Sequence, residues 1–210
     1  PSPQTSSAPR GEPAPVLLVS LDAFRADYLD RGLTPNISRM VREGVRAEWM
    51  TPTYPSLTFP NHYTIVTGLT PEHHGIVANA MRDPELGLFR NSNAAAQRDP
   101  RWWGGEPIWV TAEKQGRRAA ALFWPGSEAR IGGVSPSWWM RYEHTRPNAA
   151  RVQRVLEWLA MPADSAPAII TLYYSEHAVL LNLAGERFVD ESVGDHLTAL
   201  ALLQQPEARG

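Results

Sequence analysis

Two polar residues of this sequence stand at positions where a fold readily arranges chemistry. Asp22 closes an apolar run that begins at Pro15, and Thr58 lies just before a helix-like run at residues 61–68. A carboxylate at the carboxyl end of a buried strand lies where open α/β sheets bind ligands. A hydroxyl at a helix start faces backbone N–H groups and the positive end of the helix dipole, which favours phosphate. The structural alternatives are an aspartate that caps its own turn and a threonine that caps the helix.

A threonine hydroxyl is a poor nucleophile at neutral pH, so Thr58 needs a base or a metal ion to attack phosphorus. The sequence offers no base beside it, but Asp22 would provide a metal ligand if the two segments converge. His62 and the adjacent pair His73-His74 are weaker candidates, because neighbouring side chains on a loop often diverge. None of these histidines is predicted to bind a metal directly.

The composition narrows the possible functions. The chain has 210 residues, a formal net charge of −2 and no cysteine. The lack of cysteine excludes disulfides, thiolate zinc sites and thiol catalysis, and the lack of a basic block gives no support for nucleic acid as a partner. No apolar run reaches the roughly 18 residues that a membrane span requires. Residues 1–14 are rich in proline, serine and alanine, and they are predicted to be a flexible leader. A start at Pro1 without methionine fits a periplasmic or secreted protein whose signal peptide has been removed, and it equally fits an arbitrary boundary of the sequence.

Apolar strand-like runs alternate with helix-like runs along the chain. Strands are predicted at 15–24, 45–50, 117–126 and 166–176, and helices at 34–44, 61–68, 106–116 and 148–161. This alternation predicts an α/β fold with a mostly parallel sheet flanked by helices. In such folds ligands bind beyond the carboxyl ends of the strands, which selects the region of Asp22 and the region after Tyr174.

Other segments have weaker patterns. The last helix is predicted to present one apolar face, formed by Val152, Val155, Leu156 and Leu159. Residues 68–79 are predicted to form a loop, and residues 81–109 a long excursion with little periodicity. Six tryptophans are predicted to lie in the core or in a pocket wall: Trp102, Trp103, Trp109, Trp124, Trp138 and Trp139.

Four segments together resemble one known family, the nucleotide pyrophosphatase/phosphodiesterases, which are zinc enzymes of the alkaline phosphatase superfamily. The family's order and spacing are kept by "VSLDAFRADYL", "TPTYPSLTFPNHYTIVTGLTPEHHGIVAN", "GEPIWVTAEKQG" and "FWPGSE". The similarity extends from about Val16 to about Tyr174, and the segment around Thr58 is long and specific. The resemblance implies an alkaline-phosphatase-like fold and zinc-dependent hydrolysis of phosphodiester or pyrophosphate bonds in nucleotides.

The resemblance also implies roles for individual residues. Asp22 matches a ligand of one zinc ion, and Thr58 matches the nucleophile that binds the same zinc. Asn79 matches a donor of a hydrogen bond to a phosphate oxygen, assisted by the backbone N–H of Phe59. Phe59 and Tyr173 match the aromatic residues that sandwich a nucleobase. The first zinc would lower the pKa of the Thr58 hydroxyl, and a second zinc would stabilise the leaving oxygen and then activate water.

The sequence departs from the family pattern from about residue 176 onward. Where the family has an aspartate and a histidine that bind the second zinc, this chain has Ala178 and Asn182, which are not good zinc ligands. A later pair, Asp195-His196, lacks the preceding apolar strand and the following glycine, so it is not predicted to replace the family's ligands. We therefore expect at most a partial zinc site, weak zinc binding and phosphodiesterase activity little above background.

Three hypotheses follow from these observations. The chain is the N-terminal part of a nucleotide phosphodiesterase, cut short by a truncation or a frameshift, with a leader (1–14), a catalytic portion (15–175) and a divergent tail (176–210). Alternatively, it is a natural homologue that binds nucleotides without catalysis. The third possibility is a related hydrolase that cleaves phosphomonoesters, sulfate esters, phosphonates or lipid phosphodiesters. In each case the partner is a small-molecule ester, and no protein partner is implied.

Overall fold

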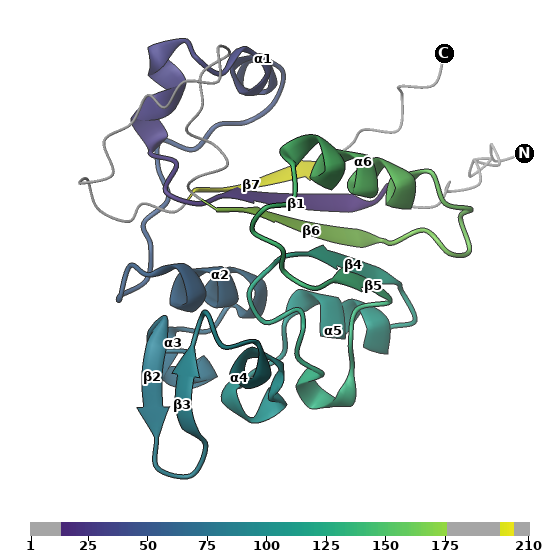
Figure 1. Cartoon of the computed structure of the whole chain (residues 1–210). Helices are drawn as coiled ribbons and strands as arrows, with labels where there is room; N and C mark the ends of the chain where they lie inside the picture. The colour runs from purple at the N-terminus through teal and green to yellow at the C-terminus, as the bar shows by residue number, and fades with distance from the viewer. Residues whose placement is uncertain (1–13, 176–197, 204–210) are drawn as a thin grey trace, which may run out of the picture.

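A five-stranded sheet forms the centre of the structure, a computed structural model that describes residues 14–175 and the backbone of residues 198–203 (Figure 1). Its order is β5-β4-β6-β1-β7, with β1 at Val16–Leu21, β4 at Ala119–Leu122, β5 at Trp138–Met140, β6 at Ile169–Tyr174 and β7 at Thr198–Leu203. All neighbouring pairs from β5 to β1 are parallel, and β7 is antiparallel to β1. The predicted α/β fold with a mostly parallel sheet is confirmed.

Strands β4 and β6 are buried along their whole length, whereas β1 is partly buried. Every residue of β4 and of β6 is buried, which is typical of parallel strands enclosed on both faces. The register pairs Leu21 with Tyr174, and the N–H of Asp22 donates to the carbonyl of Tyr174 at 2.9 Å. The carboxyl ends of β1 and β6 therefore meet at one edge of the sheet, where Asp22 leaves β1.

Helices cover the two faces of the sheet. Helix α6 (Asn148–Leu159) lies on one face, and α2 (Thr58–Thr67) and α5 (Ile108–Lys114) lie on the other (Figure 1). No helix in the described part of the chain is long and apolar enough to cross a membrane.

The buried stripe of α6 differs from the predicted one. Its buried side chains are Arg151, Val155 and Trp158, which follow the spacing i, i+4 and i+7. Val152 and Leu156, predicted to share the apolar face with Val155, are 46% and 52% exposed. That part of the prediction was wrong because aliphatic periodicity alone ignored the arginine and the tryptophan, which occupy the buried stripe.

Shorter elements surround this core. They are η1 (Ala26–Arg31), α1 (Pro35–Glu43), α3 (Pro71–His74), β2 (Ala80–Asp83), β3 (Gly87–Arg90), α4 (Ala94–Arg98), η2 (Pro100–Trp102) and η3 (Ile131–Gly133), where η marks a 3-10 helix. Strands β2 and β3 form a separate antiparallel pair. The segments predicted to be a loop and an aperiodic excursion thus contain short elements, each too brief to produce a clear period.

Residues 45–50 do not form the predicted strand. Val45 and Trp49 are fully and largely exposed, respectively, and no strand of the described residues pairs with this segment. Strand-forming residue types without a partner or a buried face do not make a strand.

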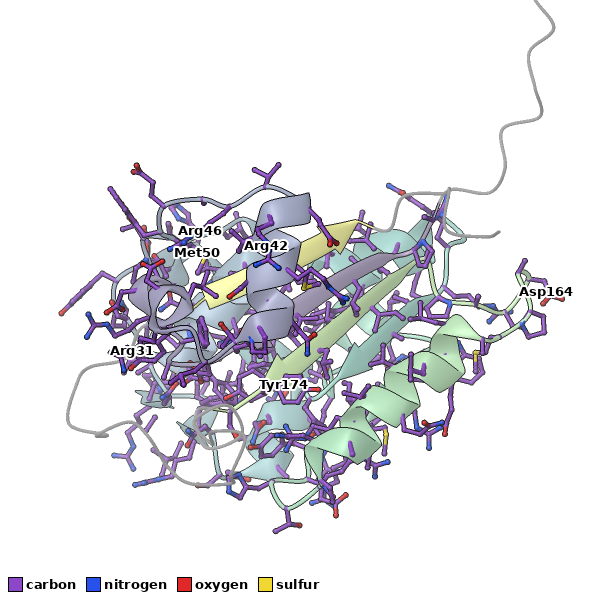
Figure 2. The ribbon with its side chains drawn as sticks, turned by 90° about the horizontal axis from the view of Figure 1, so that it is seen from above. Arg31, Arg42, Arg46, Met50, Asp164 and Tyr174 are labelled. Atoms are coloured by element: carbon purple, nitrogen blue, oxygen red, sulfur yellow. The ribbon has the colours of Figure 1, made fainter. Side chains whose placement is uncertain are left out.

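A small second core lies beside this segment, around η1 and α1. Phe24 and Tyr28 pack edge to face with ring centroids 5.4 Å apart. The guanidinium of Arg31 lies 4.3 Å from the Tyr28 ring centroid, and Arg46 pairs with Asp30 at 3.1 Å. Both arginines are seen at this end of the molecule, far from α6 (Figure 2).

The main core is rich in aromatic side chains. Four of the six tryptophans are buried as predicted: Trp102, Trp103, Trp109 and Trp124. Trp138 is partly buried against the core, whereas Trp139 is 40% exposed, contrary to the prediction. The rings of Tyr63 and Trp103 meet edge to face at 4.9 Å. Since Tyr63 belongs to α2, this packing fixes the helix that begins with Thr58.

Candidate active site

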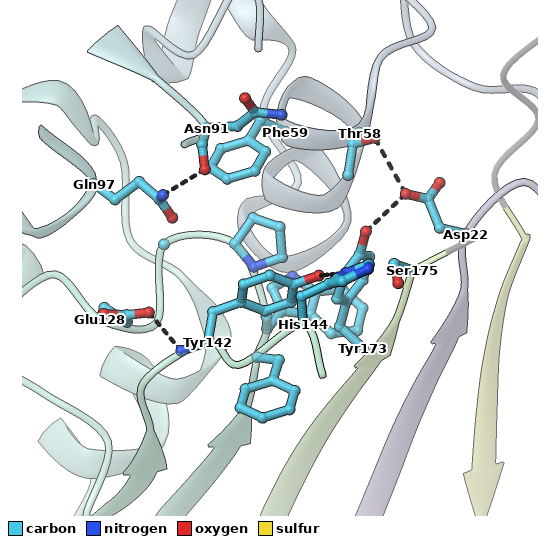
Figure 3. Close-up of a pocket in the computed structure, with 14 residues that line it drawn as sticks. Asp22, Thr58, Phe59, Asn91, Gln97, Glu128, Tyr142, His144, Tyr173 and Ser175 are labelled. Atoms are coloured by element: carbon cyan, nitrogen blue, oxygen red, sulfur yellow. Dashed lines mark hydrogen bonds between the residues drawn. The ribbon is translucent and has the colours of Figure 1, made fainter. Parts of the chain in front are cut away.

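Asp22 and Thr58 meet at the carboxyl edge of the sheet. The Thr58 hydroxyl donates to Oδ2 of Asp22 at 3.1 Å, although the residues are 36 positions apart (Figure 3). The other carboxylate oxygen, Oδ1, accepts from the N–H of Ala23 at 3.0 Å. Asp22 therefore braces its own turn, as one structural alternative predicted, and also contacts the hydroxyl of Thr58.

Thr58 is the first residue of α2 and not its cap. The N-cap is Leu57, and no side chain caps this end of the helix. The helix begins three residues before the predicted run at 61–68, because its first turn includes Thr58 and Phe59. The helix-cap interpretation of Thr58 is thus wrong, and its hydroxyl is directed to Asp22 instead.

Asn79 is held in place by the backbone of α2. Its Oδ1 accepts from the N–H of Phe59 at 2.9 Å. That N–H was expected to donate to a phosphate oxygen together with Asn79; in the structure it donates to Asn79 itself, and its expected role toward a phosphate stays a prediction. Because Oδ1 is turned to Phe59, the amide Nδ2 of Asn79 is the donor left for a ligand.

Tyr173 lines the pocket with little exposed surface, as does Phe59, which is 8% exposed. The Tyr173 hydroxyl donates to Oδ2 of Asp22 at 2.9 Å, and its ring meets His62 edge to face at 4.8 Å. The residue is only 7% exposed. Tyr142 also lines the pocket and is 39% exposed, so its ring is more accessible to a flat ligand. Sequence reasoning missed Tyr142 because it lies in a segment without periodicity.

His62 joins α2 to β1. Its Nδ1 donates to the carbonyl of Thr58 at 2.7 Å, and its Nε2 lies 2.8 Å from the Ser20 hydroxyl. A carbonyl only accepts, so Nδ1 carries the proton and Nε2 accepts from Ser20. Burial lowers the pKa of His62, against smaller opposing effects of Asp22 and the Thr58 carbonyl. The ring is therefore neutral and holds the backbone of Thr58.

The adjacent histidines His73 and His74 diverge, as expected. His73 is exposed, whereas His74 is buried and contacts the Thr64 hydroxyl at 3.0 Å through Nε2. Its Nδ1 accepts from the N–H of Ile76 at 3.2 Å, and burial lowers its pKa. His74 is thus a core residue that joins α2 to the segment leading to Asn79.

Two residues near the site have unusual backbone angles. Ala23 and Phe123, which follow the ends of β1 and β4, have φ angles of 59° and 66°. The left-handed region costs a residue with a Cβ about 1 kcal/mol or more. Strained backbone of this kind often accompanies functional sites, and here both residues adjoin the sheet edge that bears Asp22.

A pocket of about 210 Å³ opens at this edge and includes Asp22 and Thr58 in its lining. Across from Thr58 lie Tyr142 and Glu128, joined by a hydrogen bond of 2.8 Å from the Tyr142 N–H to the Glu128 carboxylate (Figure 3). Phe59 contributes a second aromatic surface.

The side chains of the pocket provide only part of the ligands that a zinc site requires. Asp22 and Thr58 offer neighbouring oxygen atoms, but residues 14–175 contain no group of three or more histidine, aspartate or glutamate side chains that would hold a metal. A typical zinc site has four ligands. The positions Ala178 and Asn182 and the pair Asp195-His196 lie outside the described residues.

Comparisons with known proteins place this site in a family context. Venom phosphodiesterase 2 from Crotalus adamanteus is 46% identical over 167 residues, which are 79% of this chain and 21% of that protein. Human ectonucleotide pyrophosphatase/phosphodiesterase family member 1 is also 46% identical over 167 residues, 79% of this chain and 18% of that protein. The chain thus spans about a fifth of the length of these relatives.

Solved structures agree with the sequence comparison. Murine ectonucleotide pyrophosphatase/phosphodiesterase 5, an inactive variant in complex with AMP, matches with a TM-score of 0.72 and 35% identity over 78% of this chain and 43% of that chain. The predicted phosphodiesterase-type fold is therefore confirmed, and the described sheet corresponds to part of it. The family model for type I phosphodiesterase / nucleotide pyrophosphatase matches residues 16–185. The chain belongs to the type I phosphodiesterase / nucleotide pyrophosphatase family.

Proposed function

We propose that the protein binds a nucleotide phosphodiester at its Asp22–Thr58 pair, with Thr58 as the nucleophile of a hydrolysis reaction. The main support is the Thr58 hydroxyl at the start of a helix, 3.1 Å from the Asp22 carboxylate in an aromatic pocket. A helix start favours phosphate, and aromatic walls favour a planar base. The pocket and the family relatives point to the same ligand class.

Each contact has a defined part in the proposed reaction. The Thr58 oxygen bonds to phosphorus while the bond to the leaving oxygen breaks; the hydroxyl proton is lost to solvent, and the leaving oxygen gains a proton from solvent. A water molecule then attacks phosphorus, the bond between phosphorus and the Thr58 oxygen breaks, and the Thr58 hydroxyl is restored. Asp22 accepts the hydroxyl hydrogen bond and orients the attacking oxygen. Nδ2 of Asn79 donates to the phosphate oxygen that gains charge. Phe59 and Tyr142 bind the base, so Tyr142 takes the role that the resemblance assigned to Tyr173.

We further propose that this chain binds zinc weakly and hydrolyses its substrate slowly. Zinc, when bound, would act as a Lewis acid at the Thr58 hydroxyl. Asp22 and Thr58 provide fewer donors than a zinc site requires, and the described residues hold no larger cluster. A carboxylate alone is too weak a base to ionise a threonine hydroxyl.

Calorimetry and an activity assay test these proposals together. AMP is titrated into the full chain in EDTA, and hydrolysis of a p-nitrophenyl nucleotide ester is followed with and without added zinc. We expect AMP to bind in EDTA and hydrolysis to stay near background. The Thr58→Ala variant should retain AMP binding and lose any residual hydrolysis. Absence of AMP binding would refute the nucleotide site, and rapid zinc-dependent turnover would refute the proposed low activity.

The alternative functions predict different results. A homologue that only binds nucleotides has the same AMP affinity and no activity that depends on Thr58. The incomplete set of metal-binding side chains among the described residues favours this alternative. A phosphomonoester or sulfate-ester hydrolase binds ribose 5-phosphate or sulfate esters as well as it binds AMP. We also propose that the protein acts outside the cytoplasm, because its relatives include venom phosphodiesterases and an ectonucleotide enzyme.

A further inference from the structure

Arg151 is a buried charge whose role is not explained by the contacts of Asp22 and Thr58. It lies on the sheet-facing side of α6 and is 1% exposed. No carboxylate of the described residues forms an ion pair with it. A buried charge is costly unless hydrogen bonds compensate for its lost hydration. The cost of burying Arg151 must therefore be offset by hydrogen bonds to other groups.

The guanidinium of Arg151 connects two separate segments of the chain. Its Nε donates to the carbonyl of Arg146 at 3.1 Å, and its Nη2 donates to the carbonyl of His144 at 3.3 Å. Its Nη1 donates to the carbonyl of Tyr173, at the end of β6, at 3.4 Å. The ring of Phe123 lies beside it, with 4.9 Å between Cζ and the ring centroid. A planar fork with several donors suits such a junction, whereas an ammonium group does not.

Both segments contribute to the pocket. Tyr142 and His144 line it from residues 141–147, which form neither helix nor strand, and Tyr173 lines it from β6. Within residues 141–147, Tyr142 is attached to Glu128 through its N–H, and Arg151 binds the carbonyls that follow. Arg151 thus acts on the pocket through the backbone and does not itself line it.

We propose that Arg151 is a positioning residue for nucleotide binding. Its guanidinium holds residues 141–147 against the end of β6, and this placement sets Tyr142 across the pocket from Phe59. The nucleotide base, and not the phosphate, is the part of the ligand that depends on Arg151. The inference deepens the proposed function and rests on it.

Two substitutions and a matched control test this role. Arg151→Lys retains the charge without the planar fork, and Arg151→Met retains most of the volume without the charge. The control is Arg154→Met on the same helix, because Arg154 is partly exposed and pairs with Glu157 at 2.9 Å. For each variant of the full chain, calorimetry in EDTA gives the dissociation constants of AMP and of ribose 5-phosphate. Hydrogen exchange measures the protection of the amides at residues 141–147.

If Arg151 positions residues 141–147, its substitution should weaken the binding of AMP but not the binding of ribose 5-phosphate. Both Arg151 variants should bind AMP at least about fivefold more weakly, as expected when a base loses an aromatic contact. Binding of ribose 5-phosphate should change by less than about twofold, and amide exchange at residues 141–147 should accelerate relative to β4 and β6. Arg154→Met should leave all of these quantities unchanged. A purely structural role would lower stability without this difference between the two ligands.

Several outcomes would overturn the inference. One is a folded Arg151→Lys variant with unchanged AMP affinity and unchanged exchange at residues 141–147. Another is an equal loss of affinity for AMP and ribose 5-phosphate, which would assign Arg151 to the phosphate. If Arg151→Met does not fold, Arg151→Lys decides the matter. If the unmodified chain does not bind AMP, the proposed function fails, and the exchange of residues 141–147 still tests the placement by Arg151.

Discussion

The two walls of the pocket are built in different ways. The nucleophile wall, which comprises Asp22 and Thr58, consists of a strand end and a helix start that His62 joins through two hydrogen bonds. The opposite wall, residues 141–147, has no regular structure and is attached to the sheet through Arg151. Side chains on regular elements are positioned more firmly than those on irregular segments. The chemistry of the site therefore depends on the fold as a whole, whereas ligand recognition depends on a few local contacts.

Replacing His62 with alanine should disrupt the junction that holds the nucleophile wall and cause the largest loss of stability. The change removes a fully buried ring and leaves the Ser20 hydroxyl and the Thr58 carbonyl without their partner. We expect the free energy of unfolding to fall by about 3–4 kcal/mol, measured by urea denaturation. The control His73→Ala, at an exposed position, should change it by less than about 0.5 kcal/mol. A loss below about 1 kcal/mol for His62→Ala would show that the junction is weak.

Replacing Tyr142 with alanine should remove the aromatic surface of the opposite wall and change the free energy of unfolding little. We expect AMP binding to weaken by about 1–3 kcal/mol, measured by calorimetry, because the base loses a stacking surface. The matched variant Tyr173→Phe removes the hydroxyl that contacts Asp22. It should lower stability by about 1 kcal/mol and leave AMP affinity nearly unchanged. The reverse pattern would return the base-binding role to Tyr173.

A decrease in pH should lower the free energy of unfolding, because His62 and His74 are buried on the α2 side of the molecule. Burial lowers both pKa values from their ordinary value of 6.5, against smaller opposing effects that include Asp22 and Glu72. Below that pH the unfolded chain takes up protons that the native histidines do not bind, so stability falls as the pH decreases and levels off above it.

Thermal denaturation provides the measurement for this pH dependence. We expect a lower Tm at a pH about one unit below the ordinary histidine pKa than at a pH about one unit above it. The difference should shrink in the variant His62→Gln, which has no titratable ring. A Tm that is independent of pH over this range would show that the two histidines do not control the acid sensitivity.

The smallest effect is expected at Ala23, where the nucleophile wall has a strained backbone. The φ angle of Ala23 is 59°, a left-handed conformation that is unfavourable for a residue with a Cβ. Ala23→Gly removes this strain, but it also increases the conformational entropy of the unfolded chain. We expect a net stabilisation of about 0.5 kcal/mol, measured by urea denaturation. Ala47→Gly, in an exposed segment without this angle, is the control and should not stabilise the protein. A destabilised Ala23→Gly variant would show that the turn is not strained.

The sheet and one side of the site were predictable from the sequence. Strands β1, β4 and β6 appear as continuous apolar runs. Both faces of β4 and β6 are buried, and β1 is partly buried. Asp22 directly follows the first of these runs, and a parallel sheet brings the ends of such strands to one edge. The sequence patterns left the convergence of Asp22 with Thr58 open, the resemblance implied it through a shared zinc ion, and the structure contains the contact.

The other side of the pocket was not predictable in the same way. Tyr142 and Glu128 lie between short elements that leave no periodic signal, and β5 itself has only three residues. The buried position of Arg151 contradicts the rule that charged residues face solvent, so apolar periodicity placed the exposed residues Val152 and Leu156 on the buried face of α6. The hydrogen bond from the Phe59 N–H to Asn79 depends on how the segment after α3 folds back, which local sequence patterns do not encode.

The hydrogen bond between Tyr173 and Asp22 has a consequence for the order of folding. The two residues are 151 positions apart, so the contact closes nearly the whole described chain into a loop. Contacts of such long range form slowly because their loop must close first. During synthesis Asp22 leaves the ribosome 151 residues before Tyr173, so its carboxylate can form this contact only after β6 has emerged. The pocket is thus assembled late, after the helix that holds Thr58 has had time to form.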